Sequence, residues 1–95
     1  VERLQSFLGA ALPHFHAGEA VIFASPDDAP GQRFFRYRWA AFLLPEVQLL
    51  PFGDPAADSR ARFLLNYGPQ IVHPRLQLVR RIPGGQLYRV RAAEP

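Results

Sequence analysis

Five consecutive apolar residues, 20–24, constrain the fold of this chain more than any other segment. The run Ala-Val-Ile-Phe-Ala is followed by turn-forming residues, which is typical of a β-strand. It lacks the polar alternation of a half-exposed strand, so we expect both of its faces to be covered. Segments with helical spacing flank the run on both sides. Strands that alternate with helices predict an α/β domain.

Two helices are predicted before and after this strand. Residues 1–12 place their apolar side chains at three- and four-residue steps, which puts them on one face of a helix. Residues 32–44 fit both strand and helix spacing, and their length favours a helix. In this second helix we expect Phe35, Trp39 and Phe42 to lie in the core.

The second half of the chain predicts a further strand, a third helix and a hairpin. The strand covers residues 47–50, and the helix runs from residue 58 or 59 to a glycine cap at Gly68. Residues 71–72 resume an extended structure. Residues 76–82 and 86–91 then flank Pro-Gly-Gly, which is a strong hairpin signal. We therefore predict a small, mainly parallel sheet with crossover helices and a C-terminal antiparallel hairpin.

Length and composition bound the organisation of the chain. Ninety-five residues suit one domain, and 48% hydrophobic residues suffice for a folded core. The chain starts with Val1 and contains no Met, so we expect a fragment of a larger protein. Its longest apolar run, residues 39–44, is far below the roughly 20 residues of a membrane span. With no Cys, a disulfide or cysteine metal site is excluded, and we predict no cofactor.

All eleven basic residues are Arg, against eight acids, which gives a formal charge of +3. Arg is a good ligand for phosphate and nucleic acid, but a genome rich in G and C produces the same bias. We favour codon bias, because net charge alone does not identify a partner.

The segment at residues 34–45 is rich in aromatic residues and Arg and ends in Leu-Leu-Pro. It resembles a helix that leads into a strand outside the membrane in bacterial polytopic glycosyltransferase-like proteins, which use lipid-linked sugars. The tail, residues 66–68, 71–72, 76–80 and 87–90, is similar to the end of such proteins after their last membrane helix. The resemblance implies an accessory role on the outer face of the cytoplasmic membrane. Family members carry their catalytic acids in loops between membrane helices, so no catalytic residue transfers to this chain.

Four residues are candidate ligand-binding residues. Asp27 and Asp28 follow the first strand, where open α/β sheets place their ligand sites. They could bind a cation or sugar hydroxyls, or they could simply form a turn and a helix cap. Arg33 and Arg36, interleaved with aromatic residues, could contact nucleic acid or anionic lipid head groups, or extend from a packed helix to solvent.

A metal site is the last candidate. His14, His16 and Glu19 have the ligand density of a zinc site. They lie in an irregular segment that does not fix their geometry, so we expect no metal.

From these observations we predict a noncatalytic extracytoplasmic accessory or interaction module of a membrane protein, and the resemblance implies a membrane glycosyltransferase as its parent. Its partner would be the parent protein, another protein, a sugar or an anionic lipid head group. One alternative is a small ligand-binding or enzymatic domain with its site at the Asp27–Asp28 loop. Another alternative is a basic nucleic-acid-binding domain. Nucleic acid is the least favoured class of partner.

Overall fold

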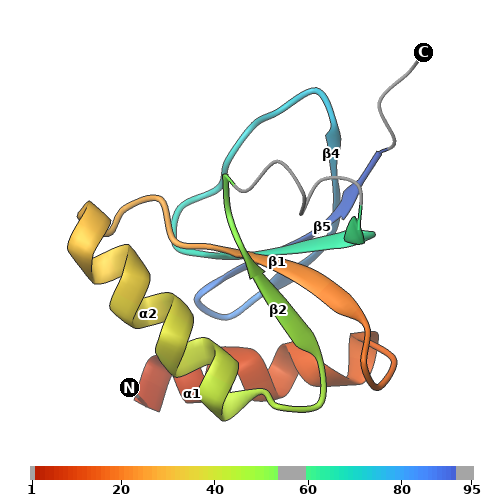
Figure 1. The fold of residues 1–95 in the computed structure, drawn as a ribbon. Helices are drawn as coiled ribbons and strands as arrows, with labels where there is room; N and C mark the ends of the chain where they lie inside the picture. Colours follow the sequence, from red (N-terminus) through yellow and green to blue (C-terminus); the bar gives the residue numbers. More distant parts are fainter. Residues whose placement is uncertain (1, 54–59, 92–95) are drawn as a thin grey trace.

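The computed structural model describes residues 2–53 and 60–91. Two α-helices and five strands form this part of the chain (Figure 1). Their bounds are α1 (Glu2–Ala11), β1 (Ala20–Ala24), α2 (Pro30–Leu43), β2 (Gln48–Pro51), β3 (Phe63–Tyr67), β4 (Leu76–Ile82) and β5 (Gly85–Val90), with one 3-10 turn at Leu12–His14. The two helices before and after β1, the strand β2 and the terminal hairpin are confirmed.

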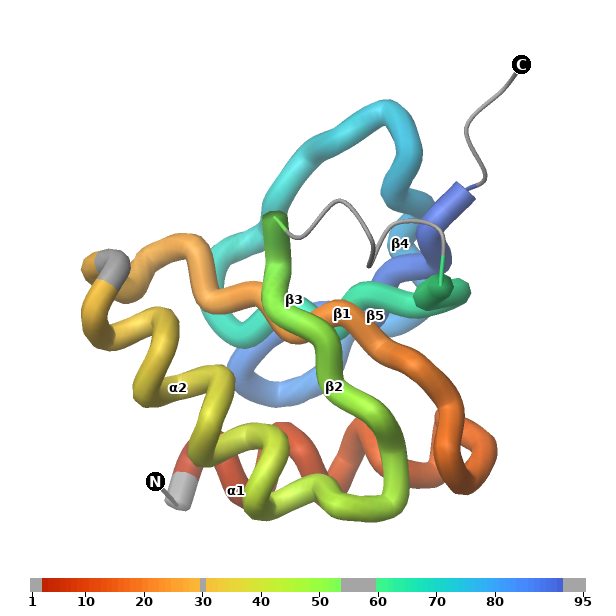
Figure 2. Tube along the Cα trace, in the orientation of Figure 1, coloured from red at the N-terminus to blue at the C-terminus, as the bar shows by residue number. Residues whose placement is uncertain are grey.

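The strands form one sheet in the order β2-β1-β3-β5-β4. Figure 2 traces the path of the chain through these strands. β1 pairs in parallel with both β2 and β3, whereas β5 pairs antiparallel with both β3 and β4. The sheet is therefore mixed, and the prediction of a mainly parallel sheet is wrong. The α/β class is confirmed in this coarser form.

Both helices lie on the same face of the sheet. Side chains alternate along β1, so that Val21 and Phe23 point to α1 and α2 while Ile22 and Ala24 point to the opposite face. Between the helices and the sheet lies the larger of two buried clusters. Its strand members also include Leu49, Leu65 and Leu87, and its helix members are Leu4, Phe7, Leu8, Ala11 and Ala40.

On the opposite face of the sheet, Ile71 of the segment between β3 and β4 packs against the second buried cluster, which also contains Ala61. Three polar side chains of β3 and β5 hold this segment in place. Asn66 Nδ2 donates to the carbonyl oxygen of Pro69 at 2.8 Å, and Gln86 Nε2 donates to that of Gly68 at 3.0 Å. The Tyr88 hydroxyl donates to the carbonyl oxygen of Ile71 at 3.2 Å. These hydrogen bonds hold the loop after β3 against this face of the sheet.

The predicted third helix is wrong over residues 61–68. Residues 63–67 form β3, and the proposed cap at residues 58–59 lies outside the described residues. Gly68 has a φ of +135° and ends a strand instead of a helix. Residues 71–72 belong to the loop that follows β3 and form no strand. β3 lies between β1 and β5, and its alternating side chains Leu64 and Leu65 are buried in the clusters on the two faces of the sheet, which local spacing does not reveal.

Candidate functional site

Arg33 closes the loop that joins β1 to α2. Its Nε donates to the carbonyl oxygen of Asp28 at 2.7 Å, and its Nη2 donates to that of Pro26 at 2.8 Å. Both acceptors belong to the turn after β1. Arg33 therefore ties the first turn of α2 to the end of the central strand, and two of its donors are engaged within the protein.

Asp28 and Arg36 form an ion pair one helical turn further along α2. Arg36 Nε and Nη2 donate to the two carboxylate oxygens of Asp28 at 3.0 and 3.3 Å. The guanidinium carbon of Arg36 also lies 5.1 Å from the centre of the Tyr67 ring on β3. The side chains are 32% and 16% exposed for Arg36 and Asp28, so the pair is partly shielded from water. It connects the loop, the helix and the sheet.

The hydrogen bond from Arg36 lowers the pKa of Asp28, against the opposing effect of partial burial. The positive charge of Arg36, a hydrogen bond from Ser25 and the charge of Arg33 lower this pKa further. The same hydrogen bond raises the pKa of Arg36. Both side chains are therefore charged at neutral pH and neutralise each other.

Replacing Asp28 by Asn is expected to lower the free energy of unfolding by about 1 kcal/mol at pH 7. The folded-state pKa of Asp28 lies below its unfolded value, so the pair contributes stability above a pH of about 4. That contribution is lost as the pH falls through the folded-state pKa. Urea unfolding of both proteins from neutral to acidic pH measures the difference. A difference that stays constant down to a pH of about 2 contradicts this role of the carboxylate.

The structure brings three of the four predicted ligand-binding residues together. Asp28, Arg33 and Arg36 bind one another or nearby carbonyl oxygens, while Asp27 is exposed beside them. Their observed contacts fix the orientation of α2 on the sheet. The two carboxylates do not form a shared free acidic site, because Asp28 is already paired with Arg36.

Glu19, one of the three residues of the predicted metal candidate, closes a local turn. Its Oε1 accepts a hydrogen bond from the backbone N–H of His16 at 3.0 Å. In the described ranges 2–53 and 60–91, no group of three or more His, Cys, Asp and Glu side chains is placed to hold a metal ion. We therefore assign the Glu19 carboxylate a role in the turn.

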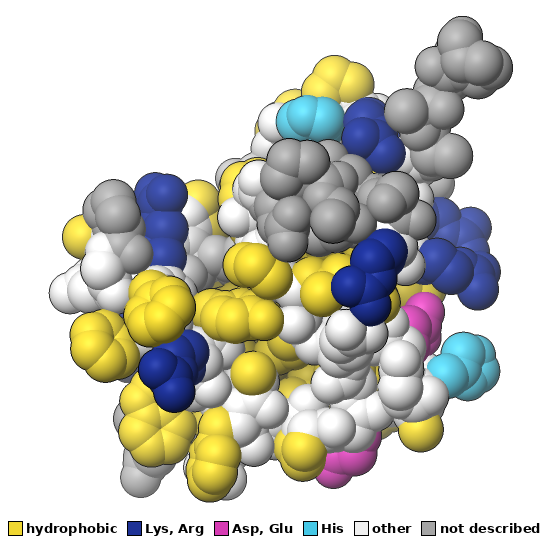
Figure 3. Space-filling view, in the orientation of Figure 1, with side chains coloured by type: hydrophobic (Ala, Val, Ile, Leu, Met, Phe, Trp, Pro, Cys, Tyr) yellow, Lys and Arg dark blue, Asp and Glu magenta, His cyan; other side chains and the backbone are white. Residues whose placement is uncertain are grey.

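The outer side of α2 carries large exposed aromatic side chains. Phe35 and Phe42 are 68% and 74% exposed, and Phe34 and Trp39 are 58% and 47% exposed. The prediction that residues 35, 39 and 42 lie in the core is therefore wrong. Figure 3 shows hydrophobic side chains gathered over α2 around a basic side chain. We call this surface, formed by Phe34, Phe35, Arg38, Trp39 and Phe42, the aromatic face.

Contacts within the aromatic face hold its rings side by side. Phe34 and Phe35 have ring centres 6.4 Å apart, and Trp39 and Phe42 have ring centres 6.0 Å apart. The guanidinium carbon of Arg38 lies 5.6 Å from the centre of the Phe34 ring. A shallow hollow of about 300 Å³ lies between Phe35, Arg38, Trp39 and Phe42. The rings and the cation therefore form one continuous surface.

The inner side of α2 explains why the aromatic face points outward. Tyr37, Ala40, Ala41 and Leu44 recur at helical spacing, and Ala40 and Leu44 are fully buried. The Tyr37 hydroxyl donates to the carbonyl oxygen of Leu49 on β2 at 2.8 Å. Turning the helix to bury the larger rings would break this bond and the ion pair of Arg36. The stripe of small residues was the sequence signal that could have identified the buried side.

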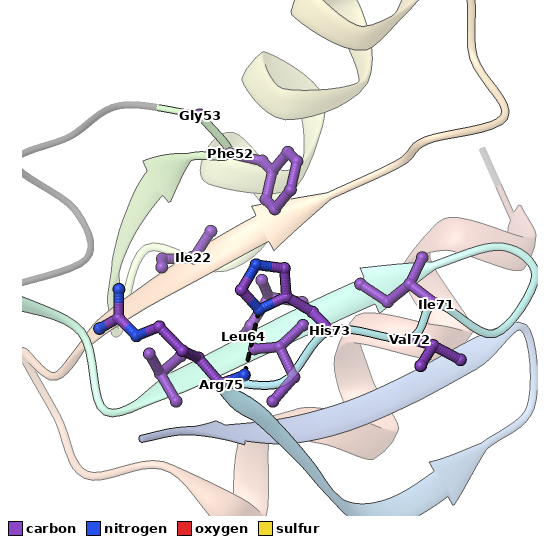
Figure 4. A pocket seen from close by; sticks show the side chains of 10 residues that line it. Ile22, Phe52, Gly53, Leu64, Ile71, Val72, His73 and Arg75 are labelled. Carbon is purple, nitrogen blue, oxygen red and sulfur yellow. Dashed lines mark hydrogen bonds between the residues drawn. The ribbon is translucent and has the colours of Figure 1, made fainter. Parts of the chain in front are cut away.

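A second hollow lies on the sheet face away from the helices (Figure 4). Ile22 and Leu64 line it from the sheet, and Phe52 and His73 border it. His73 Nδ1 accepts a hydrogen bond from the backbone N–H of Arg75 at 3.1 Å. The volume of the hollow, about 240 Å³, is below the roughly 300 Å³ at which small-molecule pockets begin. The exposed aromatic rings make the aromatic face of α2 the candidate contact surface.

Comparisons with protein families, curated proteins and solved structures find no match to the chain. Among the described residues, no helix combines the length and the apolar character needed to cross a membrane. The functional argument therefore depends on the surface chemistry of this chain, and above all on the aromatic face.

Proposed function

We propose that this chain is a noncatalytic accessory module of a larger membrane protein, located on the extracytoplasmic side, and that the aromatic face is its contact surface. The single observation that supports this proposal is the exposure of four neighbouring aromatic rings on one helix. Phe34, Phe35, Trp39 and Phe42 are each between 47% and 74% exposed. Contiguous apolar patches of this kind mark interaction sites on folded proteins.

The chemistry of the aromatic face also suits a contact surface. Aromatic residues and Arg are enriched at interfaces because they bury a large area with little loss of side-chain freedom. Arg38 supplies a cation next to the Phe34 ring. Burying one Phe side chain contributes about 2 kcal/mol, so several rings together provide a substantial driving force for association.

The charged residues next to the aromatic face orient α2 through their contacts with the loop after β1. Arg33 and Arg36 use their donors on the backbone of the turn and on Asp28. These bonds fix the angle at which α2 leaves the sheet, and therefore the direction in which the aromatic face points. They also leave Arg38 as the arginine of α2 that lies on the contact surface.

Photo-cross-linking in the longer protein, kept in its native membrane, tests this function. A benzophenone amino acid would replace Phe35 or Phe42 on the aromatic face. The control position is Val72, which is 93% exposed and lies in the loop after β3. We expect cross-links to lipid or to membrane-embedded parts of the same protein from positions 35 and 42, and at least several-fold fewer from position 72. Equal yields at all three positions, or none, contradict the proposal.

A further inference from the structure

We infer that the partner of the aromatic face is the interfacial layer of a bilayer that contains anionic lipids, with α2 lying flat on the membrane. This inference rests on the proposed function and names the surface that the module contacts. Three features of α2 support it: exposed aromatic rings along one side, the exposed Arg38 among them, and the absence of any acidic residue in the helix.

The composition of the aromatic face matches the interfacial layer. Trp favours the depth of the lipid head groups, because its ring is apolar and its N–H group can bind water or polar groups. The face contains Trp39, the only Trp of the chain, between Phe35 and Phe42. Helices that lie in a membrane surface combine such rings with basic residues.

Charge favours an anionic lipid surface as the partner. The 14 residues of α2 include three arginines and no Asp or Glu. Arg33 and Arg36 bind oxygen atoms of the preceding loop, whereas Arg38 stacks on the exposed ring of Phe34. Lipid phosphates can accept the hydrogen bonds of this guanidinium, which binds phosphate through its planar fork. The net charge of +3 adds a general attraction to an anionic surface.

The geometry of α2 allows contact along its whole length. A helix of 14 residues is about 21 Å long, and in Figure 1 α2 runs along the edge of the molecule. Its inner side packs on β1 and β2, so only the outer rings can enter a membrane. Arg38 has a long apolar stem and can keep its head group at the phosphates while the rings lie deeper. This arrangement predicts shallow insertion without a change of fold.

The test measures binding of the 95-residue chain to vesicles by the fluorescence of Trp39. Vesicles of phosphatidylcholine with one quarter phosphatidylglycerol are compared with vesicles of phosphatidylcholine alone. We expect a blue shift of the emission, quenching by lipids brominated near the head group, and tighter binding to the anionic vesicles. Removing one Arg from the contact should weaken binding to anionic vesicles about fivefold.

Variants distinguish this specific contact from nonspecific adsorption of the chain to vesicles. F42S should weaken binding about tenfold or more, because it removes a ring that enters the interface. R38Q should lose affinity for anionic vesicles and change little on neutral ones. V72S, at an exposed apolar residue away from α2, is the matched control and should bind as the parent chain does. Circular dichroism and thermal unfolding establish that all variants are folded.

Two outcomes overturn the inference: no binding to anionic vesicles, or binding that F42S and V72S reduce equally. Failure of the inference and failure of the proposed function are distinguishable. The chain could fail to bind vesicles while positions 35 and 42 cross-link to membrane-embedded polypeptide. In that case the inference of a lipid partner is wrong and the proposed accessory function stands. If those positions form no selective cross-links, the accessory function is wrong as well.

Discussion

Replacing Gly85 by Ala is expected to lower the free energy of unfolding by about 3 kcal/mol. Gly85 is the first residue of β5 and pairs with Tyr67 of β3 and Ile82 of β4. A Cβ atom at this position would overlap the backbone carbonyl oxygen of Asn66 and lie 2.9 Å from a ring carbon of Phe7. The backbone of a central strand cannot move aside without disturbing its pairing. The substitution therefore forces β5 away from β3.

Equilibrium unfolding in urea measures this loss, and Gly9→Ala provides the matched control. Gly9 lies on the exposed side of α1, and a Cβ atom there would have nothing within 4 Å. Alanine favours a helix over glycine, so G9A should stabilise the protein by about 0.5–1 kcal/mol. The explanation by close backbone approach fails if G85A costs less than about 1 kcal/mol.

The parts of the fold that were predicted correctly carry their signals locally. The apolar run at 20–24 lies between turn formers, and it is β1. The Pro-Gly-Gly sequence marks the hairpin between β4 and β5, where Gly84 adopts a φ of +101°. Such signals depend on a few neighbouring residues, so they predict the local structure without knowledge of how the rest of the chain folds.

β3 could not be predicted in this way, because its structure depends on strands that are distant in sequence. Leu64, Leu65 and Tyr67 fit a helical stripe as well as they fit a strand. The choice is made by pairing with β1 on one side and β5 on the other. Leu64 then faces one buried cluster and Leu65 the other. That pairing also makes the sheet mixed, which the local pattern did not show.

The candidate site was predicted in part, for a related reason. Asp28 was identified from its position after β1, and Arg33 and Arg36 from their place among aromatic residues; the structure brings the three together. Their role in orienting α2 depends on distances between atoms in the folded chain, which the separation of these residues along the sequence does not reveal. The aromatic face was missed because the hydrophobicity of Phe and Trp favours burial, while the helix buries Ala40 against the sheet. Small side chains allow close packing, and this chain uses them on the inner side of α2.

Two phenylalanines test this division between core and contact surface directly. Phe7 on α1 is fully buried, and its ring centre lies 5.2 Å from that of Tyr67. Phe7→Ala should therefore cost about 3–5 kcal/mol, which is a large part of the roughly 5–14 kcal/mol expected for a chain of this length. Phe35 on α2 is 68% exposed, so Phe35→Ala should change the free energy of unfolding by less than about 0.5 kcal/mol.

Urea unfolding of the two variants under the same conditions gives the comparison. The variants remove the same atoms from the chain, so their difference reports the surroundings of each ring in the folded state. Similar losses would mean that the Phe35 ring is packed in the core and that α2 is turned toward the sheet. A large loss for Phe7 alone means that folding does not require the Phe35 ring, which leaves this ring available for contact with a partner.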